Sequence, residues 1–316
     1  YSEVIYMETT VFKRKIYNEI LEWKNNRSDK YALLIRGARR VGKSTIVEEF
    51  ASKEFKSYIM LDFARTSKDI NSLFEDLYSL DFFFLQLQQL TGVRLYEQES
   101  VIIFDEVQLL PKARQAIKYL VEDGRYKYIE TGSLLSIRKN TKDILIPSEE
   151  HKIDMYPMDF EEFLWAIGDE VTADTIRLLM ENKRTAGNAM HRSLMRIFRL
   201  YMLVGGMPQA VETYLADNNL QAVDEAKREI VDLYEEDFTK IDGTGLAGDV
   251  YDAIPASLSG NASRYVLANA RAGIKSEQMK ELVPDMLSSY TVLIAYHANN
   301  PSVGMSLEKD AGRYKL

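Results

Sequence analysis

Residues 33–50, LLIRGARRVGKSTIVEEF, begin as an apolar run, pass through glycines and arginines, and resume as a helical pattern. Tyr31 to Ile35 are aromatic and aliphatic and contain no turn former, which predicts a buried strand. Beyond the glycines, apolar residues recur at the spacing of one helix face, at Ile46, Val47, Phe50, Ala51 and Phe55. Strand, loop and helix thus follow one another in the order that a phosphate-binding loop requires.

Residues 37–44 fit the pattern G-x-x-x-x-G-K-[ST] without a mismatch. Gly37 and Gly42 permit backbone conformations that a side chain would block, so successive N–H groups can converge on phosphate oxygens. Lys43 supplies a mobile charge for the β- and γ-phosphates, and the Ser44 hydroxyl is placed to ligate Mg²⁺. The segment expected to hold the nucleotide is Gly37, Ala38, Arg39, Arg40, Val41, Gly42, Lys43, Ser44 and Thr45. The alternative is a chance match in a glycine-containing turn, and the flanking strand and helix argue against it.

Two acids follow a second apolar run further along the chain. Val101 to Phe104 predict a buried parallel strand, and Asp105 and Glu106 stand at its expected carboxyl end. Asp105 would hold Mg²⁺, directly or through water, and Glu106 would orient and deprotonate the attacking water. The alternative is that the acids merely end a strand in solvent, which the phosphate-loop pattern upstream disfavours.

A third strand is predicted at Tyr126 to Glu130, followed by Thr131-Gly132-Ser133. The hydroxyls of Thr131 and Ser133 either sense the γ-phosphate and position the water, or cap the next helix, and the residues alone leave both open. Further strands are predicted at residues 58–61 and 152–155, and helices at 68–79, 81–91 and 112–122. This alternation predicts an α/β fold with a parallel, helix-covered sheet and a site at the carboxyl ends of its strands.

Composition narrows the class of protein. The 316 residues are 46% hydrophobic and 28% charged, which is globular, and the absence of cysteine excludes disulfides and thiolate metal sites and favours the cytoplasm. The three histidines, His151, His191 and His297, lack metal-ligand spacing. We expect no membrane span and no signal peptide, because the longest apolar stretch, residues 80–90, is short and carries Asp and Gln. A net charge of −8 argues against a surface coated for nonspecific DNA binding, although a local basic face stays possible.

Six segments resemble those of a known family: GARRVGKST, VIIFDEVQ, ETGS, IDMYPMDFEEFLWA, LVGGMPQAV and VLIAYH. Together they resemble the bacterial and archaeal AAA-type P-loop ATPases, over about Phe12 to Leu316. The first two motifs are shared by many NTPases, whereas their combination with YPMDFEEFL and GGMPQA is much more specific. The resemblance implies ATP as the nucleotide and a P-loop NTPase three-layer sheet of the additional-strand, catalytic-glutamate type. In that type, the sensor strand lies between the strands that bear the two Walker motifs.

The resemblance also implies the domain order. An AAA-type core is expected at residues 1–165, a helical lid at 166–240 and a winged-helix-like domain at 241–316. Family members commonly continue into a nuclease-like domain of unknown function. This chain stops at Arg313-Tyr314-Lys315-Leu316, which we expect to be the middle of a β segment, so we expect the last domain to be incomplete. No nuclease motif occurs before that point, so we assign no DNA cleavage. A winged helix either binds DNA or serves as a packing or regulatory module.

The expected lid contains one break in its helical pattern, at Gly205-Gly206-Met207-Pro208. By resemblance, this turn closes over the nucleotide, with Pro208 near the adenine. By its residues alone, it is only a helix break.

Upstream of that break, Arg192, Arg196 and Arg199 would form a basic stripe on one helix face. One of them could act as an arginine finger, or the stripe could contact the phosphates of a polynucleotide. The third possibility is that the stripe is only solvated or paired with nearby acids, and of these we expect the pairing. Arg39 and Arg40 in the loop are further candidates for the arginine finger.

Two functions from different classes follow from these features. In the first, the chain is an ATPase whose hydrolysis reorients the lid and the C-terminal domain. In the second, it is a nucleotide-gated module that recruits DNA or a protein with little turnover. Glu106 favours the first, because a pure binder has little use for a base beside the γ-phosphate. A small-molecule kinase is a weaker third interpretation.

Overall fold

The structure is a computed structural model. It describes residues 10–75, 77, 79–132, 147–259, 264–265, 270–274, 276–300 and 305–316. The chain divides into two compact units, Tyr1–Lys227 and Arg228–Leu316, and the division falls inside one long helix, α11 (Leu220–Ile241).

The first unit contains a five-stranded parallel sheet with the order β2-β3-β4-β1-β5. Its strands are β1 (Ala32–Arg36), β2 (Ser57–Asp62), β3 (Ser100–Asp105), β4 (Lys127–Gly132) and β5 (Glu150–Asp154). The strand that carries Thr131 therefore lies between the strands that bear the two Walker motifs. This order confirms the α/β fold class and the strand arrangement that the resemblance implied.

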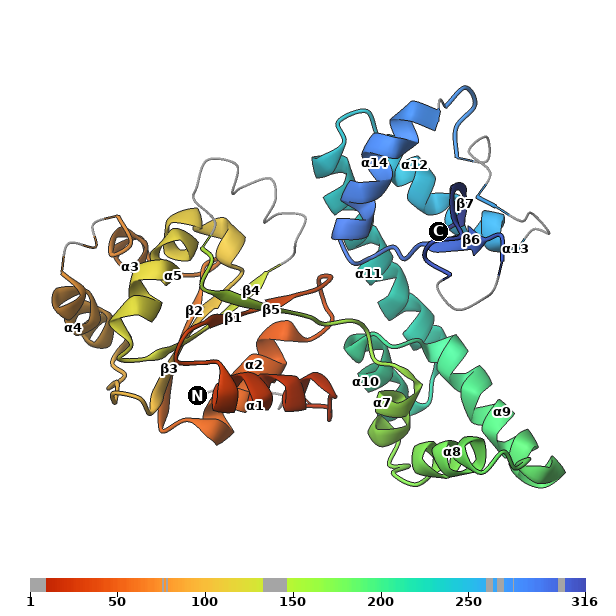
Figure 1. Ribbon diagram of the computed structural model, residues 1–316, viewed down its shortest axis with the longest axis horizontal. Coiled ribbons are helices and arrows are strands. Elements are labelled where there is room, and N and C mark those ends of the chain that lie inside the picture. The colour runs from red at the N-terminus through yellow and green to blue at the C-terminus, as the bar shows by residue number, and fades with distance from the viewer. Residues whose placement is uncertain are drawn as a thin grey trace, which may run out of the picture. The chain divides into compact units, whose positions relative to one another are not determined.

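Helices cover both faces of this sheet, as Figure 1 shows. They are α1 (Ile16–Asn26), α2 (Lys43–Glu54), α3 (Lys68–Ser72), α4 (Leu80–Thr91) and α5 (Pro111–Asp123). Residues such as Leu34, Ile102 and Phe104 face a core shared with α4 and α5. On the other face, α2 buries Ile46 and Phe50. The alternation of strand side chains between two apolar layers explains why β3 and β4 are buried at every position.

The helix predicted at residues 68–79 is shorter than expected, because α3 ends at Ser72. Phe74 turns into an aromatic cluster, with its ring centroid 5.8 Å from that of Phe63, 5.3 Å from that of Phe83 and 5.4 Å from that of Phe104. Burial of the Phe74 ring is favoured over continuation of the helix, so the helix ends before Phe74.

The rest of the first unit is helical. It contains α7 (Phe160–Ala166), α8 (Thr172–Glu181), α9 (Gly187–Val204) and α10 (Pro208–Asp217). A small core of its own includes Met158, Phe163, Val204, Val211 and Val223. The break between α9 and α10 falls at residues 205–207, and Pro208 occupies the first helical position, where its missing N–H costs nothing.

The second unit contains α12 (Leu246–Asp252), α13 (Ile254–Ser259), α14 (Ser276–Ser288) and an antiparallel pair, β6 (Ala295–Ala298) with β7 (Lys309–Lys315). Pro284 lies inside α14 without ending it. Strand β6 begins only at Ala295, because Tyr290 turns the chain with φ of 61° and Val292 then packs inward, 3% exposed. None of the described helices is long and apolar enough to cross a membrane.

Candidate functional site

The loop between β1 and α2 depends on two glycines for different reasons. Gly42 has φ of 94° directly before α2, in the left-handed region that side chains disfavour. Gly37 instead allows close approach, because a Cβ there would lie 2.3 Å from the carbonyl oxygen of Met155. The sequence suggested conformational freedom at both positions, and the structure assigns it to Gly42 only.

Lys43, the first residue of α2, is 5% exposed and turns back over the loop. Its ammonium donates hydrogen bonds to the carbonyl oxygens of Gly37, at 3.0 Å, and Ala38, at 2.8 Å. Burial lowers the pKa of Lys43 from its usual value, and the carboxylates of Glu106 and Asp105 oppose this shift. The two carbonyl oxygens therefore hold the ammonium within the loop.

Ser44 and Asp105 meet at the carboxyl edge of the sheet. The Ser44 hydroxyl donates to the Asp105 carboxylate, with distances of 2.8 and 2.9 Å to its two oxygens. Thr131, from neighbouring β4, also donates its hydroxyl to Asp105 and accepts from the backbone N–H of Glu106 at 3.2 Å. Hydroxyl and carboxylate oxygens of this kind suit Mg²⁺, which takes few protein ligands and completes its shell with water and phosphate. Among the described residues, no group of three or more His, Cys, Asp or Glu side chains could hold a metal ion.

Glu106 adopts an uncommon conformation, with φ of 54° at a residue that is not glycine. Its carboxylate accepts a hydrogen bond from the side-chain amide of Gln108, which is 3% exposed. Gln108 belongs to the segment VIIFDEVQ, but its residue type and position in the sequence did not point to this role. A buried amide thus holds the carboxylate that is the candidate base.

Arg14 was also missed, and it contacts the phosphate loop directly. Only 6% exposed, it donates to the carbonyl oxygens of Val41, at 2.9 Å, and Tyr156, at 2.6 Å. Its guanidinium also forms a buried ion pair with Glu162, at 3.2 Å. A basic residue between two lysines reads as a surface residue, so no signal in the sequence pointed to this role.

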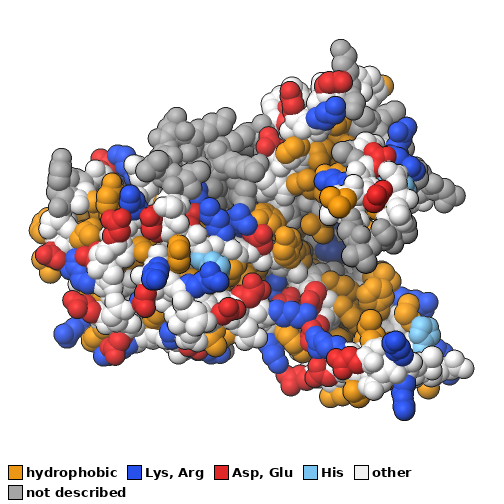
Figure 2. All heavy atoms as spheres, viewed as in Figure 1, with side chains coloured by type: hydrophobic (Ala, Val, Ile, Leu, Met, Phe, Trp, Pro, Cys, Tyr) orange, Lys and Arg blue, Asp and Glu red, His pale blue; other side chains and the backbone are white. Residues whose placement is uncertain are grey.

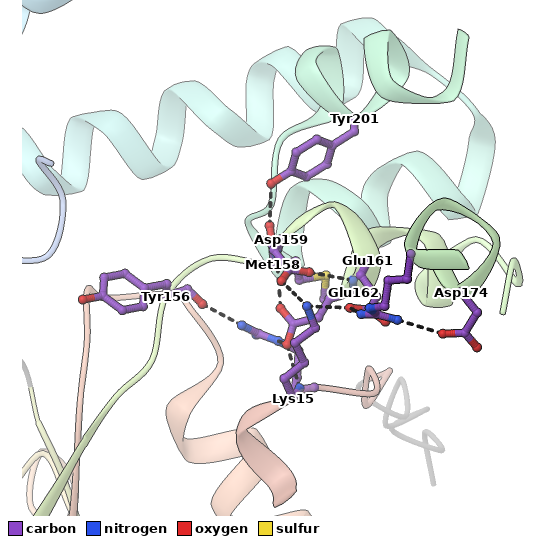
Figure 3. Close-up of polar contacts among 10 residues, drawn as sticks. Lys15, Tyr156, Met158, Asp159, Glu161, Glu162, Asp174 and Tyr201 are labelled. Carbon is purple, nitrogen blue, oxygen red and sulfur yellow. Dashed lines mark hydrogen bonds and ion pairs between the residues drawn. The ribbon is translucent and has the colours of Figure 1, made fainter. Parts of the chain in front are cut away.

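The segment after β5 joins these contacts to the helical part of the unit (Figure 3). Asp159 and Glu162 form a capping box at the start of α7. The Met158 N–H donates to the carbonyl oxygen of Gly206 at 2.7 Å, and the Met158 carbonyl accepts from the Tyr201 hydroxyl at 2.8 Å. The motif YPMDFEEFL therefore connects the phosphate loop, through Arg14, to the turn between α9 and α10.

Replacing Gly206 with alanine is expected to break this connection. A Cβ there would lie 2.1 Å from the carbonyl oxygen of Met158 and 2.9 Å from its nitrogen, so the backbone must shift. We expect Gly206→Ala to lower the stability of the first unit by about 1–3 kcal/mol, measured by thermal unfolding. Gly243→Ala, where an added Cβ meets nothing within 4 Å, is the control. Equal melting temperatures for the two variants would contradict the close packing.

Pro208 lies beside the phosphate loop. Its Cγ is 3.6 Å from the point that a Cβ added to Gly42 would occupy. A small cavity opens there, lined by the N-terminal segment from Thr10 to Phe12, by Thr45 at the start of α2 and by Glu212 of α10. The structure thus brings Pro208 next to the residues predicted to bind the nucleotide.

The remaining candidates are placed differently. Arg39 and Arg40 are exposed on the loop, and Ser133 lies outside the described residues. The arginines of α9, Arg192, Arg196 and Arg199, are exposed, and none forms an ion pair with another described residue. The expectation that they pair with nearby acids is therefore wrong for the described part of the chain.

Comparison with known proteins finds family matches over two parts of the chain. Residues 29–164 match a family described as AAA domain, and residues 195–314 match a domain of unknown function, DUF8612. None of the curated proteins matches the sequence.

Solved structures resemble the whole chain at low identity. The Walker-type ATPase paby2304 of Pyrococcus abyssi has 16% identity and a TM-score of 0.52, and the match covers 97% of this chain and 93% of that one. The RuvB Holliday junction branch migration motor of Thermotoga maritima has 13% identity and a TM-score of 0.38, with 90% of each chain covered. The ORC1 protein of Aeropyrum pernix, solved with DNA, has 14% identity and a TM-score of 0.34, with 94% and 88% covered. Of these three, only the first bears on the fold. Residues 29–164 therefore match an AAA domain, and the chain shares its fold with a Walker-type ATPase.

Proposed function

We propose that this chain binds ATP with Mg²⁺ and hydrolyses it. The observation that carries the proposal is the convergence of Ser44, Asp105, Thr131 and Glu106, drawn from α2, β3 and β4, at one edge of the sheet. Oxygen ligands for a hard cation and a carboxylate for proton transfer are thereby adjacent, which is the arrangement that phosphoryl transfer to water needs.

Each group has a separate task in this proposal. The loop amides and the Lys43 ammonium bind the phosphates, and Ser44 and Asp105 hold the cation. When bound, Mg²⁺ would offset the negative charge of the phosphate oxygens. Glu106 accepts a proton from the attacking water, and the Thr131 hydroxyl fixes the backbone that carries Glu106. The buried amide of Gln108 orients the Glu106 carboxylate.

The nucleobase of the bound ATP would lie in the cavity between the N-terminal segment and Pro208. The contact of Pro208 with Gly42 supports this placement, and the resemblance of GGMPQA to the family motif suggests adenine.

The proposal includes movement of the helical region on hydrolysis. Arg14 touches the loop carbonyl of Val41, and the Glu162 with which it pairs caps the helix next to Met158 and Gly206. Displacement of the loop by phosphate would therefore reach the α9–α10 turn through a short series of buried contacts.

The proposed domains remain an AAA-type core at residues 1–165, a lid at 166–240 and a winged-helix-like domain at 241–316. The helices and the antiparallel β6–β7 pair of the second unit support the last assignment.

The test is phosphate release by the purified chain with ATP, with and without Mg²⁺ and with and without DNA. We expect steady release that requires Mg²⁺ and stops on chelation. Release that is absent under every condition, although nucleotide binds, would overturn the hydrolysis proposal and favour the nucleotide-gated switch.

A further inference from the structure

The lid carries a basic segment in an acidic protein. Residues 182–211 contain no aspartate or glutamate, whereas the whole chain has 48 acidic residues and a net charge of −8. The same segment contains five cationic residues: Lys183, Arg184, Arg192, Arg196 and Arg199. This local asymmetry is the opposite of the mixed charge that ordinary protein surfaces carry.

Three of these residues form one line on α9. Arg192, Arg196 and Arg199 are four and three residues apart, so they project from the same side of the helix over about 10.5 Å. All three are exposed, and none has an ion-pair partner among the described residues. We call them the α9 arginine stripe.

Other cations near α7 and α8 form ion pairs with acids, unlike the α9 arginine stripe. Lys15 pairs with Asp159 at 2.5 Å and with Glu161 at 2.7 Å. Arg177 of α8 pairs with Asp174 at 2.8 Å and with Glu161. Both acids are labelled in Figure 3. The nearby acids are thus paired with Lys15 and Arg177, and none of them is paired with the α9 arginine stripe.

We infer that the α9 arginine stripe binds the phosphodiester backbone of a nucleic acid. Guanidinium groups are planar, remain charged and match phosphate oxygens in pairs. One strand of a duplex presents a phosphate about every 3.4 Å along its axis, so a line of about 10.5 Å spans roughly three of them. Contacts of this kind position a protein on nucleic acid without reading its sequence.

Two other anionic partners fit less well. A membrane-surface helix needs a wide, continuous apolar face that is free. Phe198, Met202 and Leu203 of α9 are exposed, but Ile197, Leu200 and Tyr201 pack against the core around Met158 and Phe163, so most of the apolar face is already covered. A protein surface would offer both signs of charge, whereas residues 182–211 offer only one. In Figure 2, blue side chains project over the region of α8 and α9, at the lower right. A uniform polyanion is the partner that this charge pattern complements.

The test is fluorescence anisotropy with labelled duplex DNA and, as a separate arm, single-stranded RNA, over a salt series. The test variant combines Arg192→Gln, Arg196→Gln and Arg199→Gln. Its matched control removes three exposed, ion-paired charges elsewhere, with Lys53→Gln, Lys56→Gln and Lys112→Gln. Circular dichroism and thermal unfolding establish that both variants are folded.

Three phosphate contacts correspond to a salt slope of about −2.7 on duplex DNA and about −2.1 on single-stranded RNA. Between about 50 and about 200 mM salt, these slopes are roughly a 40-fold and roughly a 20-fold loss of affinity. We expect the stripe variant to lose about this part of the slope on at least one of the two nucleic acids, and the control to keep it. Equal slopes for stripe variant and control, or no binding by the wild type, would overturn the inference. It would also fail if polyglutamate or vesicles with anionic lipid competed as well as nucleic acid. None of these outcomes depends on ATP hydrolysis.

Discussion

Replacing Glu106 with glutamine is expected to lower phosphate release at saturating ATP by about 10²–10⁴-fold and to leave Mg-ATP affinity nearly unchanged. The amide cannot accept the proton of the attacking water, but it keeps the size and position of the side chain. Glu106 is hydrogen-bonded to Gln108 and not to the phosphate loop, so its replacement removes no hydrogen bond of the loop. The measurement is single-turnover phosphate release alongside equilibrium binding of a fluorescent ATP analogue.

Glu75→Gln is the matched control for this variant. Its carboxylate pairs with Lys112 at 3.3 Å, with both side chains more than half exposed. We expect it to hydrolyse ATP at the wild-type rate. Wild-type turnover by Glu106→Gln would mean that another group is the base.

Replacing Arg14 with methionine is expected to destabilise the first unit by about 3–5 kcal/mol. The Arg14 and Glu162 side chains are 5% and 7% exposed, so the variant leaves a buried carboxylate without its partner and two carbonyls without a donor. Urea unfolding followed by tryptophan fluorescence measures the loss, because both tryptophans, Trp23 and Trp165, lie in this unit.

Two further variants test whether the loss of stability comes from the buried ion pair of Arg14 and Glu162. Lys13→Met removes a neighbouring ion pair whose side chains are 61% and 71% exposed, and we expect less than about 1 kcal/mol. Adding Glu162→Gln to Arg14→Met removes the uncompensated charge and is expected to recover part of the stability. If Lys13→Met and Arg14→Met cost the same, Arg14 does not hold the loop in the way that its contacts suggest.

The sheet could be predicted from the sequence because its determinants are local. Apolar runs such as Val101 to Phe104 have no alternative to burial, and glycines and acids mark where the runs end. The phosphate loop was predictable for the same reason, since Gly42, Lys43 and Ser44 are adjacent in the chain. The order of the strands did not follow from this patterning and came from the resemblance.

Contacts between distant segments could not be predicted. Arg14 reaches Val41, Tyr156 and Glu162 only after the chain has folded, and its local sequence resembles that of a surface lysine pair. Competition between elements was equally hidden. Burial of Phe74 shortened α3, although its residues continue a helical pattern.

Which charged residues form ion pairs with one another also could not be predicted from the local sequence. The acids around α9 suggested salt bridges to Arg192, Arg196 and Arg199. In the described residues, Glu161 and Asp174 are instead taken by Lys15 and Arg177. Which cation reaches an acid depends on the position of the helices, and the composition of the segment does not reveal it.

Titration calorimetry of ATP in the presence of Mg²⁺, on the wild type and on Lys43→Ala, tests the account most directly. We expect the wild type to bind one ATP per chain with a heat that requires Mg²⁺. Lys43→Ala should bind at least about 100-fold more weakly, because a charge-assisted contact within the loop is lost. Binding by Lys43→Ala that matches the wild type, or no Mg-dependent binding by either protein, would contradict the account.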